Sequence, residues 1–164
     1  MAFPHDLLDW LQETAPATAI RESEVLFPTI ETVHVLALVL VVGTIAHVDL
    51  RLLSLGSRRR AVTALAREVL PWTWAAFGAA VVSGGLLFSS NAVKYYDNVP
   101  FRVKIALLAL AGVNMAIFHA LTWRGVRRWD LGRPPLAAQL AGGLSLLLWV
   151  GIVAMGRWIG FTMK

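Results

Sequence analysis

Long apolar blocks separated by short polar segments run through most of the chain. A helix needs about 20 mostly apolar residues to cross roughly 30 Å of hydrocarbon, and four blocks reach that length, at about 28–53, 71–90, 101–123 and 135–160. An amphipathic run at residues 3–13 is too short to span and predicts a helix that either lies in the interface or packs on the spans. Short connections favour antiparallel neighbours. The pattern predicts an all-α fold, an integral membrane four-helix up-down bundle with a short N-terminal interfacial helix, in one domain covering residues 1–164.

Proline stands at the start of two of these blocks. Pro28 opens the first and Pro71 the second. Proline is favoured in the first turn of a helix, where its missing N–H would have no partner anyway. We therefore predict that the first two membrane helices begin near these residues.

The composition also indicates an integral membrane protein, because 57% of residues are hydrophobic and only 15% are charged. The chain has no cysteine, which excludes disulfides, iron–sulfur clusters and covalently attached haem. The net charge is +5, but the basic residues cluster at the ends of the blocks. Basic residues there serve topology and lipid headgroups rather than nucleic acid. The expected partner is the lipid bilayer, with no nucleic acid.

Basic residues are divided unequally between the two ends of the predicted bundle. The first and third loop regions hold Arg51, Arg58, Arg59, Arg60, Arg67, Arg124, Arg127, Arg128 and Arg133. The opposite side holds Arg21, Lys94, Arg102, Lys104, Arg157 and Lys164, together with an acidic N-terminal segment. Because cytoplasmic loops carry an excess of Lys and Arg, the sequence predicts a multi-pass membrane protein with the arginine-rich loops in the cytoplasm and both termini outside, which is periplasmic in a Gram-negative bacterium.

Ionisable residues within the blocks are the candidates for function, because they are costly in a membrane. They are Glu31, His34, His47, Asp49 and His119. His47 and His119 each lie seven residues, about 10 Å, beyond the centre of a span that runs in the same direction. Two histidines at one depth are what a b-type haem requires, and Arg51 and Arg124 are placed to meet its propionates. Alternatively, the histidines hydrogen-bond to backbone, to Asn114 or to each other.

A second candidate site is Glu31 with His34 at the opposite end of the first span. Glu-x-x-His places both side chains on one helical face, a spacing used for metals in helical bundles. The metal would be copper, zinc or iron. Alternatively, Glu31 pairs with His34 or Arg157 and joins two helices.

Three stretches of the chain are distinctive, namely ETVHVLALVLVVGTIAHVDLRLLSLG, LPWTWAAFGAAVVSGGLLF and YYDNVPFRVKIALLALAGVNMAIFH. They resemble a family of small bacterial four-span membrane proteins of unknown function, and the likeness covers about residues 24–155. It implies a bacterial inner-membrane protein and supplies no activity. More distantly, the bundle is similar to membrane b-type cytochromes and copper-resistance membrane proteins. With three histidines in its spans, this chain holds at most one bis-histidine haem.

These observations support one main functional hypothesis and two alternatives. The first is a membrane b-type haem protein that passes electrons within the bilayer, as a small subunit of a larger membrane redox complex or as a homo-oligomer. The others are a haem-free structural or accessory subunit and a periplasm-facing metal-handling protein. No nucleotide-binding loop and no nucleophile–base pair is visible, so the sequence leaves open whether the protein is an enzyme.

Overall fold

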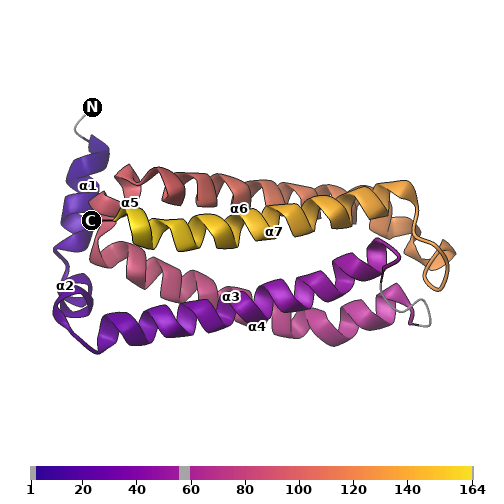
Figure 1. Ribbon diagram of the computed structural model, residues 1–164, viewed down its shortest axis with the longest axis horizontal. Coiled ribbons are helices and arrows are strands. Elements are labelled where there is room, and N and C mark those ends of the chain that lie inside the picture. Colours follow the sequence, from indigo (N-terminus) through magenta and orange to yellow (C-terminus); the bar gives the residue numbers. More distant parts are fainter. Residues whose placement is uncertain (1–2, 56–59, 164) are drawn as a thin grey trace.

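The computed structural model describes residues 3–55 and 60–163, and in that part of the chain all regular structure is helical (Figure 1). The elements are α1 (Phe3–Gln12), α2 (Ala15–Glu22), α3 (Leu26–Leu52), α4 (Val62–Ser90), α5 (Ala92–Asp97), α6 (Val99–Ile117), the π-helical η1 (Phe118–Thr122), the 3₁₀-helical η2 (Trp123–Arg128) and α7 (Leu136–Thr162). The all-α fold with four long apolar helices is confirmed. Arg58, Arg59 and Lys164, which entered the prediction of topology, lie outside the described residues.

The four long helices lie side by side along the length of the molecule, and both termini are at one end (Figure 1). The short helices α1, α2 and α5 cover that end, which we call the terminal end. The opposite end carries the α3–α4 and η2–α7 connections, and we call it the loop end. α3 packs on α4, α6 packs on α7, and α3 joins the two pairs by packing on α7. Within the described residues, α4 and α6 make no extensive contact, so the bundle is open on that side.

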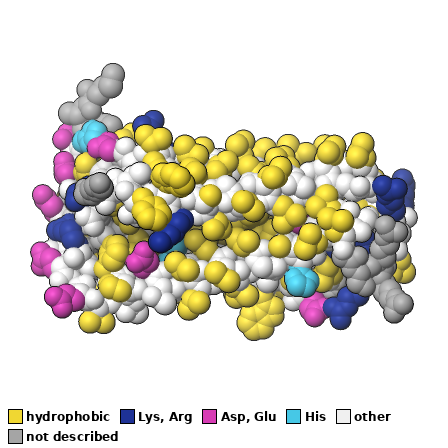
Figure 2. Space-filling model, viewed as in Figure 1, with side chains coloured by type: hydrophobic (Ala, Val, Ile, Leu, Met, Phe, Trp, Pro, Cys, Tyr) yellow, Lys and Arg dark blue, Asp and Glu magenta, His cyan; other side chains and the backbone are white. Residues whose placement is uncertain are grey.

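The surface of the bundle has the character expected of membrane spans. Four helical segments are long and apolar enough to cross a bilayer, namely Leu26–Leu52, Val62–Ser90, Val99–Arg128 and Leu136–Thr162. Charged side chains gather mainly at the two ends, and hydrophobic side chains cover most of the length between them (Figure 2). Large apolar side chains such as Leu36, Val82 and Leu147 are exposed. In a membrane these faces contact lipid instead of water.

The N-terminal segment forms a short helix at the predicted position, α1, and a second helix, α2, that the sequence did not predict. α1 packs against α5 and α4, while Leu7 and Trp10 remain 57% and 65% exposed. The Arg21 guanidinium donates to the carbonyls of Gln12 (2.9 Å) and Ser90 (3.1 Å), which ties α1 and α2 to the end of α4. The segment is thus packed on the spans and still presents apolar side chains at the terminal end.

α4 begins nine residues before Pro71, so the prediction that this helix starts near Pro71 is wrong. Its first turn is held by a residue distant in sequence. The Asp130 carboxylate accepts hydrogen bonds from the Thr63 N–H (2.8 Å) and the Thr63 hydroxyl (2.7 Å), and the Asp130 carbonyl accepts from the Val62 N–H (3.1 Å). These bonds satisfy N–H groups that a helix N-terminus otherwise leaves free. Pro71 is therefore accommodated inside the helix, where it forgoes one backbone hydrogen bond.

Because Asp130 caps α4 as a carboxylate, the stability of the protein depends on pH in the acid range. Burial acts to raise the pKa of Asp130, but hydrogen bonds from Thr63 and Val62 and the positive charge of Arg51 outweigh it and hold the pKa below its ordinary value of 3.8. When folding lowers the pKa of a carboxyl group, the contribution of that group to the free energy of unfolding is complete above the pKa of the unfolded state. The contribution is lost as the pH falls through the pKa of the folded state. We expect Asp130→Asn to lower the melting temperature at pH 7 and the difference from wild type to shrink below about pH 4. Thermal unfolding across this range measures it, and a difference independent of pH would contradict it.

Candidate functional site

A cavity of about 250 Å³ lies among all four long helices, toward the loop end. Its lining comes from α3, α4, α6, η1 and α7 and is mainly apolar. The polar residues that line it are Thr44, Asp49, Thr73, Asn114, His119 and Ser145. The aromatic residues, apart from His119, are Trp74, Phe77, Phe118 and Trp149. Trp74 and Met115 in the lining are 52% and 44% exposed on α4 and α6, so the cavity reaches the surface between these two side chains.

Asp49 is the only acidic side chain among the residues lining this cavity. It lies in the last turns of α3 and is 6% exposed. Its Oδ2 atom is buried without a hydrogen-bond partner within the part of the chain that the structure describes. A buried polar atom with no partner is uncommon and calls for an explanation. Asp49 is therefore the strongest candidate for a functional group in the cavity.

The Ser145 side chain hydrogen-bonds to the Asp49 carboxyl group, whereas the other neighbouring polar side chains direct their protons elsewhere. The Thr73 hydroxyl donates to Thr44 Oγ1 (2.8 Å), and the Thr44 hydroxyl donates to the Leu40 carbonyl (2.8 Å). The Asn114 amide donates to the Ala141 carbonyl (3.0 Å), which joins α6 to α7. These residues are already used in helix packing. Their oxygen atoms remain available as acceptors to a molecule in the cavity, and the Asn114 amide keeps one further N–H.

The close crossing of α3 and α7 fixes the position of Asp49. A Cβ atom added at Gly142 would lie 3.1 Å from the Asp49 carbonyl oxygen and 3.1 Å from Leu52 Cβ. Small residues allow this kind of backbone approach between membrane helices. The distance from α3 to α7 beside Asp49 thus depends on the absence of a side chain at Gly142.

A matched pair of glycine variants tests this crossing. Gly142→Ala forces a backbone contact apart, whereas a Cβ at Gly143 meets only the flexible end of Leu53 at 3.6 Å. We expect Gly142→Ala to destabilise the protein by about 1–3 kcal/mol, as overpacking does, and Gly143→Ala to be close to neutral. Thermal unfolding in one detergent compares the two. Equal effects would show that the crossing is looser than described.

The structure does not bring His47 and His119 together around this cavity. His119 lines it from η1, but His47 is exposed and is absent from the lining. Val48 faces the cavity, and the adjacent His47 projects about 100° away around α3. The two residues were expected at one depth, but their side chains point in different directions around the bundle. A haem held by both histidines does not fit this arrangement of side chains.

His119 itself is well placed to accept a hydrogen bond or bind a metal. Its Nδ1 lies 2.9 Å from the Met115 carbonyl oxygen. A carbonyl can only accept, so Nδ1 carries the proton and Nε2 of the neutral ring keeps its lone pair. The ring lies against Trp123, with 5.7 Å between centroids. Its location in a π-helical segment is a further feature found often at functional sites.

The two arginines expected near haem propionates have different surroundings. Arg51 is 1% exposed, and its guanidinium donates to the carbonyls of Arg60 (3.1 Å), Asp130 (3.1 Å) and Gly132 (3.3 Å). It therefore joins the two connections at the loop end. Arg124 is exposed in η2. Neither residue lines the cavity.

Glu31 and His34 lie in the half of α3 near the terminal end. His34 Nδ1 is 3.0 Å from Ser83 Oγ, whose own proton goes to the Ala79 carbonyl (2.6 Å), so His34 donates to Ser83. Gly84 leaves room for the imidazole, because a Cβ there would lie 2.9 Å from His34 Cε1. Burial and the nearby Glu31 carboxylate raise the pKa of Tyr95. Across the described residues, no three His, Cys, Asp or Glu side chains form a group able to hold a metal ion.

From the sequence, Asp49 is one of several ionisable residues within the spans, and its pattern indicates no particular role. The signal that could have selected it is the VDLRLL stretch, where one carboxylate follows a long apolar block. A pair of histidines suggests a specific chemistry such as haem ligation. The role of a single carboxylate, in contrast, depends on the residues that surround it. Those surroundings come from four helices and were not visible along the chain.

Comparison with known proteins gives a family but no activity. No curated protein and no solved structure matches the chain. One family, described as a family of unknown function (DUF6644), matches residues 23–162. The match includes all four long apolar helices and every residue of the cavity. The chain therefore belongs to this family of unknown function, DUF6644.

Proposed function

We propose that this protein is a membrane protein that binds a small organic cation with an apolar body in the cavity between its helices. The observation that carries the proposal is the Asp49 carboxyl group, buried in the cavity with Oδ2 unpartnered among the described residues. The opening between α4 and α6 gives such a molecule a route from the bilayer.

The charge of the ligand follows from the cost of burying a carboxylate. An ionised carboxylate in an apolar interior is strongly disfavoured unless it is paired. No lysine or arginine lines the cavity, so a proton or a bound cation must neutralise Asp49. Arg51 is near in sequence, but its guanidinium donates to three carbonyls at the loop end.

The aromatic walls add a second attraction for a cation. Trp74, Phe77, Phe118 and Trp149 all line the cavity. The face of an aromatic ring attracts a cation, and aromatic cages bind quaternary ammonium groups in this way. A carboxylate combined with aromatic walls therefore favours an ammonium group over a neutral molecule or an anion. The volume is below the roughly 300–1,000 Å³ of pockets for drug-sized ligands, so the ligand is small.

The experiment compares one cation with its neutral isostere. Benzyltrimethylammonium and neopentylbenzene have nearly the same shape and differ by exchange of the charged nitrogen for carbon. Binding to the purified protein in lipid nanodiscs is measured by the change in tryptophan fluorescence, because Trp74 and Trp149 line the cavity. We expect the cation to bind at least about tenfold more tightly, about 1.4 kcal/mol. Equal affinity for the two molecules would contradict the proposal.

Haem binding is the second candidate, and the observation that favours it is the free Nε2 of His119 in the cavity. A metal-bound histidine commonly donates its other N–H to a carbonyl, as His119 does to Met115. A haem would require a ligand other than His47 or a rearrangement of α3. The test is an absorption spectrum of protein made with ample haem, in which a Soret band lost in His119→Ala supports the candidate. The accessory-subunit and metal-handling hypotheses remain predictions from the sequence.

We also propose that the loop end faces the cytoplasm of a bacterial inner membrane and the terminal end faces the periplasm. The excess of arginine in the two connections of the loop end supports this orientation. Reporter fusions after Arg128 and after Asp97 test it. Cytoplasmic activity at the first site and periplasmic activity at the second are expected, and the reverse result would overturn the orientation.

A further inference from the structure

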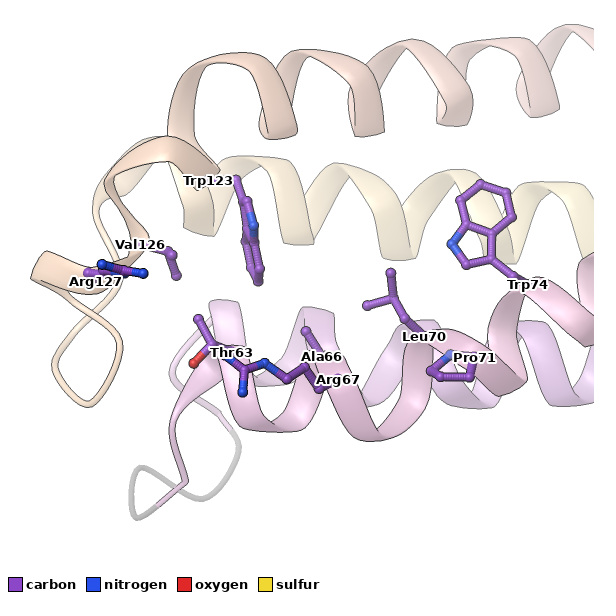
Figure 3. Close-up of a pocket in the computed structure, with 9 residues that line it drawn as sticks. All are labelled: Thr63, Ala66, Arg67, Leu70, Pro71, Trp74, Trp123, Val126 and Arg127. Atoms are coloured by element: carbon purple, nitrogen blue, oxygen red, sulfur yellow. The ribbon is translucent and has the colours of Figure 1, made fainter.

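A second hollow lies beside the cavity, on the outer surface between α4 and η2 (Figure 3). We call it the arginine groove, and its volume is about 600 Å³. Its walls include Arg67, Leu70, Pro71, Trp74, Trp123 and Arg127. Figure 3 shows Arg67 and Arg127 toward the loop end of the groove and Trp74 at its other end. The groove is thus charged at one end and apolar along the rest of its length.

The two arginines are not used to hold the fold in the way that Arg51 is. Both side chains are exposed, and neither forms an ion pair with another described residue. The nearest acidic residue along α4, Glu68, instead pairs with Arg60 at 3.1 Å and does not line the groove. The groove therefore presents two guanidinium groups with no acidic side chain among its lining residues.

The charged end lies at the depth of lipid headgroups. α4 has 29 residues and so is about 44 Å long, compared with roughly 30 Å of hydrocarbon. Arg67 is five residues, about 8 Å, from the start of the helix, which places it near the boundary of the hydrocarbon. Trp74 is a further seven residues, about 10 Å, along the helix. The length of the groove thus runs from headgroup depth into acyl-chain depth.

We propose that the arginine groove binds an anionic phospholipid of the surrounding bilayer. Its phosphate lies between the guanidinium groups of Arg67 and Arg127, since guanidinium donates two parallel hydrogen bonds to phosphate oxygens. Its acyl chains lie along Leu70, Pro71 and the rings of Trp74 and Trp123. The ring of Trp123 is held in position because it packs on Phe118, with 5.9 Å between ring centroids. Apolar walls at this depth select a lipid rather than a soluble phosphate.

Native mass spectrometry of the full-length protein tests the proposal. The protein is equilibrated in neutral detergent with equal amounts of phosphatidylglycerol and phosphatidylcholine that carry the same acyl chains. We expect wild type to retain phosphatidylglycerol preferentially and Arg67→Gln/Arg127→Gln to reduce that preference at least about tenfold. The control, Arg124→Gln/Arg128→Gln, removes the same charge from exposed residues that do not line the groove, and it keeps the preference.

Three outcomes would overturn the proposal. One is a wild-type protein that shows no preference between the two lipids, a result that needs no variant. Another is equal loss in both double variants, which would mean general attraction to a basic surface. The third is displacement of the lipid by glycerol 3-phosphate at equal concentration, which would identify a site for a soluble phosphate. Arg67→Lys/Arg127→Lys, which retains the charges, checks that lost binding is not lost folding.

Discussion

Asp49→Asn is expected to weaken the binding of benzyltrimethylammonium by about 30- to 150-fold. The substitution keeps the shape of the side chain and removes its negative charge. Loss of one partner from a buried charge pair costs at least about 2–3 kcal/mol, which corresponds to this change in affinity. The affinity for neopentylbenzene is expected to change little, because the apolar and aromatic walls stay in place. Titration of both molecules against wild type and variant measures the two effects.

A control carboxylate separates the cavity from the overall charge of the protein. Asp97 lies at the end of α5 with its side chain 59% exposed. Asp97→Asn removes the same charge from the surface, and we expect it to leave the affinity of the cation unchanged. A cation that binds Asp49→Asn as tightly as wild type would show that Asp49 is not its partner. The arginine groove would be unaffected by that result, because its test involves no cation.

Arg51→Ala is expected to have the largest effect on stability, about 3–5 kcal/mol. The side chain is 1% exposed and donates to three carbonyls from the α3–α4 and η2–α7 connections. Hydrogen bonds to charged groups contribute about 1.5–3 kcal/mol each, and buried carbonyls left without donors add a desolvation cost. At about 2–4 °C per kcal/mol for a chain of this size, a decrease of roughly 10 °C in Tm is expected. Thermal unfolding in detergent measures it.

Two further variants identify the cause of that loss. Arg51→Lys keeps the charge but lacks the planar fork of donors, so an intermediate decrease is expected. Arg124→Ala removes an exposed arginine of η2 and is expected to change stability by no more than about 0.5 kcal/mol. If Arg51→Ala is as mild as Arg124→Ala, the loop end is held by other contacts, such as those of Asp130 with Thr63.

Much of the fold is predictable from the sequence, because the length of apolar blocks is a local property. The first and fourth blocks, at 28–53 and 135–160, end within two residues of α3 (Leu26–Leu52) and α7 (Leu136–Thr162). The third block, at 101–123, agrees with the structure in its extent but not in the type of helix along it. Its end changes from α-helix to π-helix and then to 3₁₀-helix from Phe118 onward, and nothing in its hydropathy indicates this change.

The second block shows where local reasoning fails. Its hydropathy and Pro71 suggested a start that is nine residues too late, because the turn from Val62 is stabilised by Asp130 from another connection. Counting residues along two spans likewise predicts an equal depth for His47 and His119. The direction of each side chain around its helix is not predictable in this way, because it depends on which neighbours pack against that helix.

Hydropathy along the chain is thus enough to predict the number of long helices and their approximate limits. These quantities follow from hydrophobic length and the fixed rise of a helix. Helix packing determines the rest, because α4 and α6 make no extensive contact, Gly142 brings α7 against α3, and Asp49 faces the resulting cavity. Hydropathy does not reveal this packing, since lipid-exposed and buried faces of a membrane helix are similarly apolar. Hydropathy therefore predicts how deep a residue lies in the membrane, whereas helix packing determines which residues surround it.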